Sequence, residues 1–167
     1  MTRDVIGDER HFVDEGALPV YRRSMDIRPL SITDFNRLTK TFVRAYPDSW
    51  SEDVARRYLV KFFHFEPESC LAAIKDGQLI GAILGYSYLK QENLVMFIQE
   101  LFVDPDFRKT GCGTELVKAL RRSFSSSKAV EVTPMVKGDT RVLNFYNSLG
   151  FEQPTSMAFI VDADDDD

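Results

Sequence analysis

Apolar and polar residues recur with two different periods along the chain, and each change of period marks a boundary between predicted elements. Residues 25–30 (MDIRPL) alternate as in a half-buried β-strand. Residues 31–46 have the helical period instead, with apolar positions at Phe35, Leu38 and Phe42. Ser31 and Asp34 occupy capping-box positions just before them. A strand followed by a helix is therefore predicted here.

A second helix and an antiparallel meander are predicted next. Ser51 is a favourable helix cap, and the apolar residues after it at helical spacing are Val54, Tyr58 and Phe62. Residues 69–89 contain two β-rich runs around Asp76 and Gly77, a dipeptide that supplies the positive φ angles of a tight hairpin turn. Residues 93–103 (NLVMFIQELFV) form a third run, which completes the meander.

The period changes again after Pro105. A third helix is predicted by the apolar residues Leu116, Val117, Leu120 and Phe124. Residues 129–136 (AVEVTPMV) are typical of a short strand. Asp139 can cap a last helix, which ends at Gly150 and whose apolar face consists of Val142, Tyr146 and Leu149. Residues 156–161 (SMAFIV) are predicted to form the final strand.

Length and composition fit one globular domain. The chain has 167 residues, of which 44% are hydrophobic, enough for a real core. We expect a domain at residues 24–161, preceded by an extension at residues 1–23 that packs as an extra strand or crosses to a partner. The net charge of −5 equals the charge of the five aspartates in residues 162–167, so the body is neutral (−5 + 5 = 0). We expect this acidic tail to be disordered.

Several classes of function are disfavoured by the composition. The sequence has no apolar run of about 18 residues and begins without the apolar stretch of a secretion signal, so we expect a cytoplasmic protein without membrane contact. Cys70 and Cys112 stand far apart, and the only histidines are His11 and His64, which argues against a disulfide framework or a metal site. The sequence has no broad basic face for nucleic acid.

Residues 107–116 (FRKTGCGTEL) place a glycine-rich bend between a predicted strand and a predicted helix. Free N–H groups at a helix N-terminus attract anions, so the bend is a candidate diphosphate site. Gly111 and Gly113 would let the main chain approach a phosphate, and Arg108 and Lys109 would add charge. A Rossmann fingerprint would need glycine at Leu116, and a P-loop would need Gly-Lys-Ser/Thr. The alternative is a turn that only reverses the chain.

The flanking residues favour the anion site. The segment LFVDPDFRKTGCGTELVKAL resembles the acetyl-coenzyme A motif of the GNAT N-acetyltransferase superfamily, Arg/Gln-x-x-Gly-x-Gly/Ala after a strand that ends in Val-x-Pro. The later segment NFYNSLGF is similar to a second signature of that family. The order of predicted elements matches from Met25 to Val161. The resemblance implies an α/β GNAT fold, with a mixed, mostly antiparallel six- to seven-stranded sheet and helices on both faces.

The resemblance also implies how acetyl-coenzyme A would bind. Backbone N–H groups would cradle its diphosphate at Arg108, Lys109, Thr110, Gly111, Cys112, Gly113 and Thr114. A splayed strand edge would pair with its pantetheine arm at Leu101, Phe102 and Val103. Asn144, which begins NFYNSLGF, joins the cofactor-binding set. Asp139 replaces an asparagine that many members have. Cys112 lies at a helix N-terminus, which can depress the pKa of a thiol, although a tolerated small residue explains it as well.

Two residues are candidates for proton transfer. Tyr146 falls on the position of the family's usual general acid, and a phenol with a pKa of about 10 stays protonated at neutral pH. Without the resemblance it would be read as a core aromatic residue. Glu100 is the candidate base, with binding of the acceptor or pairing with an arginine as alternatives. Some members have that carboxylate one position earlier, at Gln99 here, and adjacent strand residues normally face opposite sides.

The acceptor is expected to bind near residues 45–50 (AYPDSW). Tyr46 and Trp50 would form aromatic walls, Asp48 would attract a cation, and Gln99 completes the predicted substrate-binding set. Trp50 can also be read as a staple of the second helix. We therefore expect an N-acetyltransferase that moves acetyl from acetyl-coenzyme A to a primary amine of a small molecule by direct attack.

Other functions stay open from the sequence. The alternatives are a protein or peptide N-acetyltransferase and a coenzyme A-binding regulatory protein without turnover. An exposed strand edge or the N-terminal extension would also offer a surface for a homodimer.

Overall fold

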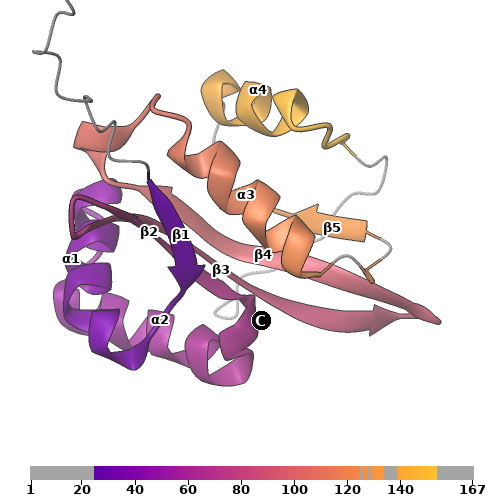
Figure 1. Ribbon diagram of the computed structural model, residues 1–167, viewed down its shortest axis with the longest axis horizontal. Helices are drawn as coiled ribbons and strands as arrows, with labels where there is room; N and C mark the ends of the chain where they lie inside the picture. Colours follow the sequence, from indigo (N-terminus) through magenta and orange to yellow (C-terminus); the bar gives the residue numbers. More distant parts are fainter. Residues whose placement is uncertain (1–24, 125, 128, 134–138, 154–167) are drawn as a thin grey trace, which may run out of the picture.

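The elements of the fold follow the order predicted from the sequence. The computed structural model describes residues 25–153 except 125, 128 and 134–138. Its strands and helices are β1 (Asp26–Pro29), α1 (Phe35–Ala45), α2 (Glu52–Phe65), β2 (Cys70–Lys75), β3 (Gln78–Lys90), β4 (Asn93–Val103), α3 (Cys112–Ser123), β5 (Ala129–Val132) and α4 (Thr140–Ser148) (Figure 1). The N-terminal extension, the predicted last strand and the acidic tail lie outside the described residues.

The described strands form one mixed sheet in the order β1-β2-β3-β4-β5. The first three pairings are antiparallel, and only β4 and β5 are parallel. This arrangement is the mixed, mostly antiparallel sheet that was expected. Five strands lie among the described residues, fewer than the six or seven expected, and the expected final strand lies outside them.

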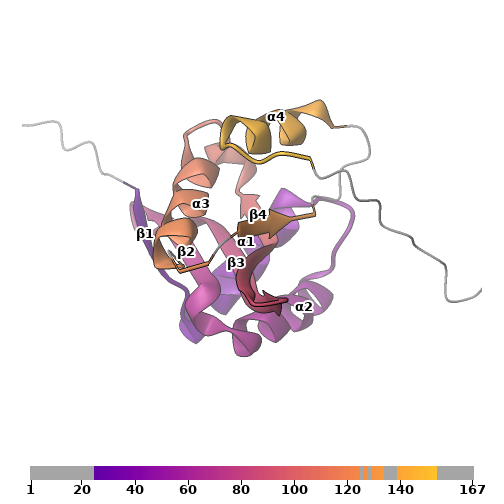
Figure 2. The same cartoon turned by 90° about the vertical axis from the view of Figure 1, so that its right-hand side faces the viewer.

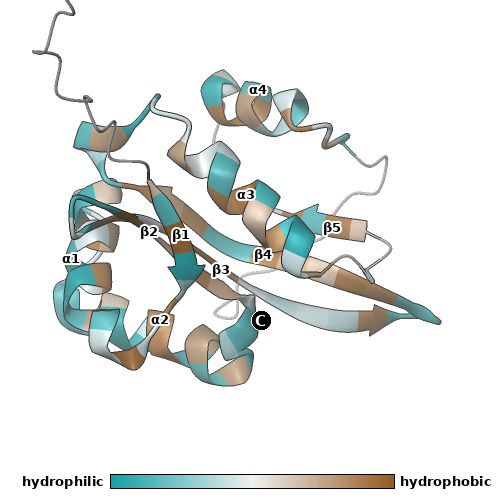
Figure 3. Ribbon diagram, in the orientation of Figure 1, coloured by the Kyte–Doolittle hydropathy of each residue, from teal (hydrophilic) through white to brown (hydrophobic). Residues whose placement is uncertain are grey.

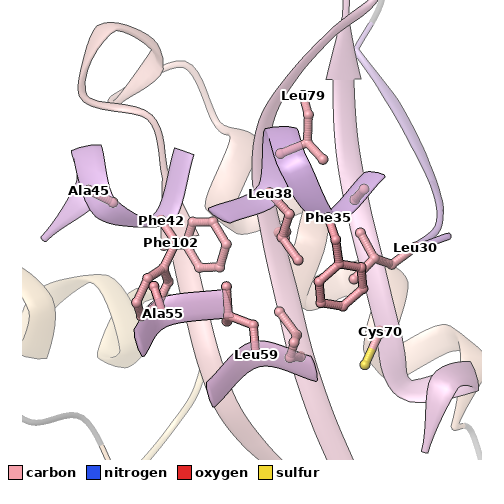
Figure 4. Close-up of a cluster of buried hydrophobic side chains, with 13 residues drawn as sticks. Leu30, Phe35, Leu38, Phe42, Ala45, Ala55, Leu59, Cys70, Leu79 and Phe102 are labelled. Atoms are coloured by element: carbon pink, nitrogen blue, oxygen red, sulfur yellow. The ribbon is translucent and has the colours of Figure 1, made fainter. Parts of the chain in front are cut away.

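Helices cover both faces of the sheet. Helices α1 and α2 lie on one side and α3 and α4 on the other (Figure 1, Figure 2). Apolar and polar residues alternate along the helices in the hydropathy view (Figure 3), and the buried apolar residues of α1, α2 and α3 pack against the sheet. One core cluster joins α1 and α2 to the sheet through residues such as Phe35, Phe42, Leu59 and Phe102 (Figure 4). A second cluster joins α3 to the other face through Ile83, Ile98 and Leu116.

Local signals in the sequence account for the start of α1 and the first hairpin. Ser31 and Asp34 form the predicted capping box ahead of a short 3-10 turn that leads into α1. Asp34 is buried and also accepts a hydrogen bond from Arg28 at 2.8 Å, which holds the pKa of its carboxyl below the ordinary value. Asp76 and Gly77 have the predicted positive φ angles, 52° and 78°. These signals work because each depends on neighbouring residues only.

A β-bulge in β4 was not predicted. Leu84 pairs with Glu100 and Gly85 pairs with Ile98, so Gln99 is an extra residue in β4. Ile98 packs in the cluster under α3, and so does Leu101 three residues later, although side chains three apart in a regular strand face opposite sides. The bulge therefore shifts the alternation of β4 by one residue. It lies where β4 meets the candidate site.

Candidate active site

The turn before α3 has the backbone geometry of an anion site. Gly111 takes the N-cap position with φ 85°, and Lys109 also has a positive φ of 61°. Among the described residues, no backbone hydrogen bond uses an N–H group of residues 109–114, whereas the N–H of Glu115 already bonds Gly111. The first N–H groups of α3 are thus available at its positive end. Gly111 has open space where a Cβ would stand.

Gly113 also makes room for a side chain of α4. A Cβ at Gly113 would lie 3.3 Å from the ring of Phe145 in α4. The second glycine therefore allows α3 and α4 to pack closely, while Gly111 supplies the backbone conformation. The sequence had indicated that both glycines make room for a phosphate.

Arg108 and Arg44 fasten the turn to the end of α1. The guanidinium of Arg108 donates to the carbonyl oxygen of Ala45 at 2.9 Å. Arg44 lies 3.3 Å from the buried Asp104 and 2.8 Å from Asp106. Arg108 is thus a brace between the turn and α1, besides any contact with phosphate. Lys109 and Thr110 are exposed in the turn.

The strand edge predicted to receive the pantetheine arm is open in the described residues. β5 pairs only with residues 95–98 of β4. The N–H of Asp104 donates to Ile80 of β3 at 2.8 Å, so alternation turns the N–H and C=O groups of Leu101 and Val103 away from β3, toward the open edge. Phe102 points to the α1 side and is buried there. The backbone at Leu101 and Val103 can therefore bond an extended guest.

Glu100 lies on the α1 and α2 side of β4 and accepts hydrogen bonds from two phenols. The hydroxyl of Tyr58 in α2 donates to Oε1 at 2.6 Å, and that of Tyr46 is 3.4 Å from Oε2. Burial raises the pKa of Glu100, while the two hydrogen bonds lower it, and the net shift is upward. No ion pair with Glu100 is present among the described residues, so pairing with an arginine gains no support there.

Gln99 also forms a hydrogen bond with Tyr58, and we call Tyr46, Tyr58, Gln99 and Glu100 the Glu100 network. Its Nε2 donates to the hydroxyl oxygen of Tyr58 at 2.9 Å. The expectation that Gln99 and Glu100 face opposite sides is wrong, because the bulge brings both side chains to Tyr58. Tyr58 is the site residue that sequence reasoning missed. Its only signal was its place on the helical stripe of α2, which was interpreted as packing.

Tyr146 lies on α4 within electrostatic reach of Glu100. Burial, followed by the charge of Glu100, raises the pKa of Tyr146 to about 12. Its ring packs against Phe145 and Phe151, with centroid distances of 5.0 and 5.3 Å. The two candidates for proton transfer are therefore close enough for their charges to interact, although they come from different faces of the fold. Asn144 lies two residues before Tyr146 on α4 and is exposed.

The acceptor residues after α1 divide into two groups. Tyr46 and Trp50 pack on Phe42, with ring centroids 4.9 and 5.3 Å away, and Trp50 also lies 4.9 Å from Tyr58. These two rings thus border the Glu100 network. Asp48 is exposed in the turn with a positive φ of 65°, and no hydrogen bond or ion pair joins it to the Glu100 network in the described residues.

Cysteine and metal chemistry receive no support at this site. Burial raises the pKa of the Cys112 thiol to about 11, so the depressed value considered from the sequence is wrong. Burial likewise raises the pKa of Cys70 to about 12. No group of three or more histidine, cysteine or acidic residues that could hold a metal ion occurs in the described part of the chain. His64 is exposed at the end of α2.

A cavity of about 490 Å³ lies elsewhere, between the C-terminal ends of α3 and α4 and the start of β5. Its lining includes Arg121, Phe124, Val130 and Phe151 and none of the predicted site residues. No helix in the described ranges is long and apolar enough to cross a membrane.

Comparison with known proteins gives a family and a fold. The family described as Acetyltransferase (GNAT) family matches residues 35–151. No protein with a curated function matches the sequence. The aminoglycoside N-acetyltransferase AAC(6')-Iy, bound to a bisubstrate analogue of coenzyme A, is similar in structure with a TM-score of 0.68, 20% identity, and coverage of 83% of this chain and 98% of that chain.

Two further structures share this fold. A chain of the NatC complex bound to Gag peptide and coenzyme A has a TM-score of 0.66 and 19% identity, over 78% of this chain and 86% of that chain. PH1933 from Pyrococcus horikoshii has a TM-score of 0.69 and 16% identity, over 81% and 93%. At identities of 20% or less, these similarities show a shared fold and nothing beyond it.

Proposed function

Since the chain belongs to the GNAT acetyltransferase family, whose acyl donor is acetyl-coenzyme A, we propose that it transfers acetyl to a primary amine of a small molecule. The observation that carries this proposal is the half-buried carboxylate of Glu100, which has hydrogen-bond donors but no cation beside it in the described residues. A buried charge without a counterion is costly, and a protonated amine would supply the missing charge.

The residues present fit the cofactor. The free N–H groups of residues 109–114 suit a diphosphate, and the outward N–H and C=O groups of Leu101 and Val103 suit the amide groups of pantetheine. The bound cofactor would supply a thioester, whose carbonyl carbon accepts the amine and whose sulfur leaves. Arg108 would hold the turn in place through Ala45.

Glu100 and Tyr146 would move the protons. The amine nitrogen must lose a proton before it can attack, and Glu100 is the carboxylate that would receive it. As the new C–N bond forms and the C–S bond breaks, Tyr146 would donate its hydroxyl hydrogen toward the sulfur. Its raised pKa keeps that hydrogen in place at any pH below about 12. The ammonium loses two protons overall. Glu100 would take the first before attack and release it to solvent, and the second, lost from nitrogen as the amide forms, would restore the proton that Tyr146 gives to the sulfur.

An assay of free thiol with a panel of amines tests the proposal. The panel should contain small alkylamines, polyamines, an aminoglycoside and peptides with free N-termini, with acetylated products identified by mass. We expect thiol release with at least one small amine. Tyr146→Phe should lower kcat by roughly 10- to 100-fold and leave cofactor affinity nearly unchanged. The expected loss is moderate because a thiolate is a stable leaving group.

The outcomes of that assay separate the alternatives. Acetylation of peptides alone would replace a small-molecule acceptor with a protein N-terminus. Tight cofactor binding without thiol release from any amine, together with an unaffected Tyr146→Phe variant, would indicate a regulatory protein that binds coenzyme A.

Tyr58→Phe should move the acid limb of the pH profile. The Tyr58 hydroxyl stabilises the ionised form of Glu100, so its removal should raise the pKa of Glu100 further. The base must be ionised, and the acid limb of kcat/KM should therefore shift to higher pH. Tyr46→Phe is the matched control. Its hydroxyl is 3.4 Å away instead of 2.6 Å, so the shift should be smaller. An unchanged limb in Tyr58→Phe would remove Tyr58 from this role.

A further inference from the structure

A row of aromatic rings leads away from the Glu100 network along α2 and the β3–β4 hairpin. Tyr58 contacts Phe62 at a centroid distance of 5.1 Å, and Phe62 stacks on Tyr86 at 6.4 Å with an interplanar angle of 16°. Tyr86 lies 5.3 Å from Phe97, its partner in the register of β3 and β4. Trp50 extends the row at the other end, 4.9 Å from Tyr58. We call Trp50, Tyr58, Phe62, Tyr86 and Phe97 the aromatic row.

The aromatic row is only partly buried. All five of its members keep intermediate exposure, so their rings are not sealed in the core. Phe65 packs on Tyr86 at 5.6 Å and leaves 68% of its own surface exposed. The tip of the β3–β4 hairpin projects past the helices in Figure 1, and Phe62 and Phe65 at the end of α2 lie against the hairpin at Tyr86. A molecule that holds its amine at Glu100 would meet these rings.

The carboxylates beside the aromatic row are already engaged. Glu66 accepts hydrogen bonds from the N–H and hydroxyl of Ser87 and from the hydroxyl of Ser69. Glu131 accepts from Tyr88 at 2.6 Å and pairs with Lys90 at 2.8 Å. Of the three carboxylates Glu66, Glu131 and Glu100, only Glu100 has no hydrogen-bond or ion-pair partner besides phenols in the described residues. The region offers a place for one positive charge and a large apolar surface.

From this arrangement we infer that the acceptor is a monoamine with an apolar, ring-bearing body: its amine lies at Glu100 and its ring packs on Phe62, Tyr86 and Phe97. The inference rests on the proposed function and names its substrate class. Aromatic pairs contribute energy beyond the area they bury, and an apolar ring gains from leaving water. An acceptor rich in hydroxyls and positive charges would leave those groups without partners on this surface.

Paired substrates give the direct test. With saturating acetyl-coenzyme A, we expect kcat/KM for 2-phenylethylamine to exceed that for ethylamine by about tenfold or more, since a buried ring is worth roughly 1.5 to 3 kcal/mol. Spermidine and kanamycin, which carry several charges, should be poorer than 2-phenylethylamine. Trp50 is the only tryptophan of the chain, so its emission offers a second readout of amine binding that does not depend on turnover.

Variants locate the contact. Phe62→Leu and Tyr86→Leu keep an apolar side chain but remove the ring, and each should lower the preference for 2-phenylethylamine over ethylamine by about fivefold. Leu89→Ala is the matched control. Leu89 lies on the same hairpin, is 72% exposed and is outside the aromatic row. Its replacement should leave the preference unchanged.

Two distinct failures can be told apart. The inference that a ring of the acceptor packs on the aromatic row is wrong if small amines are acetylated but 2-phenylethylamine shows no advantage, or if the leucine variants keep the full preference. The proposed function stands in either case. If the cofactor binds and no amine releases thiol, the proposed function fails, and the inference that rests on it fails as well.

Discussion

Glu100→Gln should lower kcat by about 100- to 10,000-fold, the usual contribution of a general base. Glutamine has nearly the same shape, but it neither accepts a proton from the amine nor offers a negative charge to it. The amine would therefore bind more weakly and stay protonated, so KM should rise as well. Steady-state kinetics against 2-phenylethylamine or the best amine of the panel would measure both effects. Calorimetric titration should show unchanged affinity for coenzyme A, because the glycine-rich turn is untouched.

The pH profile adds a second measurement on the same residue. Burial raises the pKa of Glu100, so the acid limb of kcat/KM should lie above the ordinary range of a glutamate, and activity should fall as pH drops through it. That limb should be missing from the residual activity of Glu100→Gln. Glu92→Gln, at an exposed position in the β3–β4 turn, is the matched control and should behave as the parent. Full activity in Glu100→Gln would remove the carboxylate from the chemistry.

Gly85→Ala should destabilise the protein by about 3 kcal/mol or more, at the upper end of the range for overpacked sites. A Cβ at Gly85 would lie 2.7 Å from the carbonyl oxygen of Phe97 and 3.2 Å from the sulfur of Met96. The first contact is with backbone of the paired strand, which cannot move aside alone. Because Gly85 pairs with Ile98 at the bulge, the strain falls beside Gln99 and Glu100. Urea unfolding would measure the loss of stability.

Gly77→Ala is the control variant for the loss of stability expected in Gly85→Ala. Gly77 has a φ of 78° and open space where a Cβ would stand, so its replacement costs only the strain of a left-handed backbone, about 1 kcal/mol. Equal losses in the two variants would mean that β3 and β4 separate easily at Gly85. In that case the bulge would not be held by close contact between the strands.

Much of the fold was accessible from the sequence because its signals are local. The capping box at Ser31, the cap at Ser51 and the Asp76-Gly77 turn all lie where the pattern placed them. The glycine-rich bend likewise precedes α3, with Gly111 in the left-handed conformation. Each of these features is decided by a few adjacent residues, and a short window of sequence contains them.

The arrangement around Glu100 was less accessible because it depends on pairing between distant residues. The register of β4 on β3 decides whether Gln99 and Glu100 face the same side, and no residue near Gln99 indicates a bulge. The only hint was Gly85, which lies far away in the sequence. Tyr58 was missed for a related reason: a tyrosine on an apolar helical stripe is normally a packing residue, and its hydroxyl partner comes from another element.

The extra residue in β4 places a second polar side chain beside Tyr58 while the strand keeps its pairing with β3. Deletion of Gln99 would leave Ile98 and Glu100 adjacent, with their pairings to Gly85 and Leu84 unchanged, so Glu100 would stay on the α1 and α2 side. A chain shortened by this one residue could keep both its ladder to β3 and its carboxylate, but it would lose the amide that donates to Tyr58. The length of the strand at this point therefore decides how many polar side chains reach Tyr58.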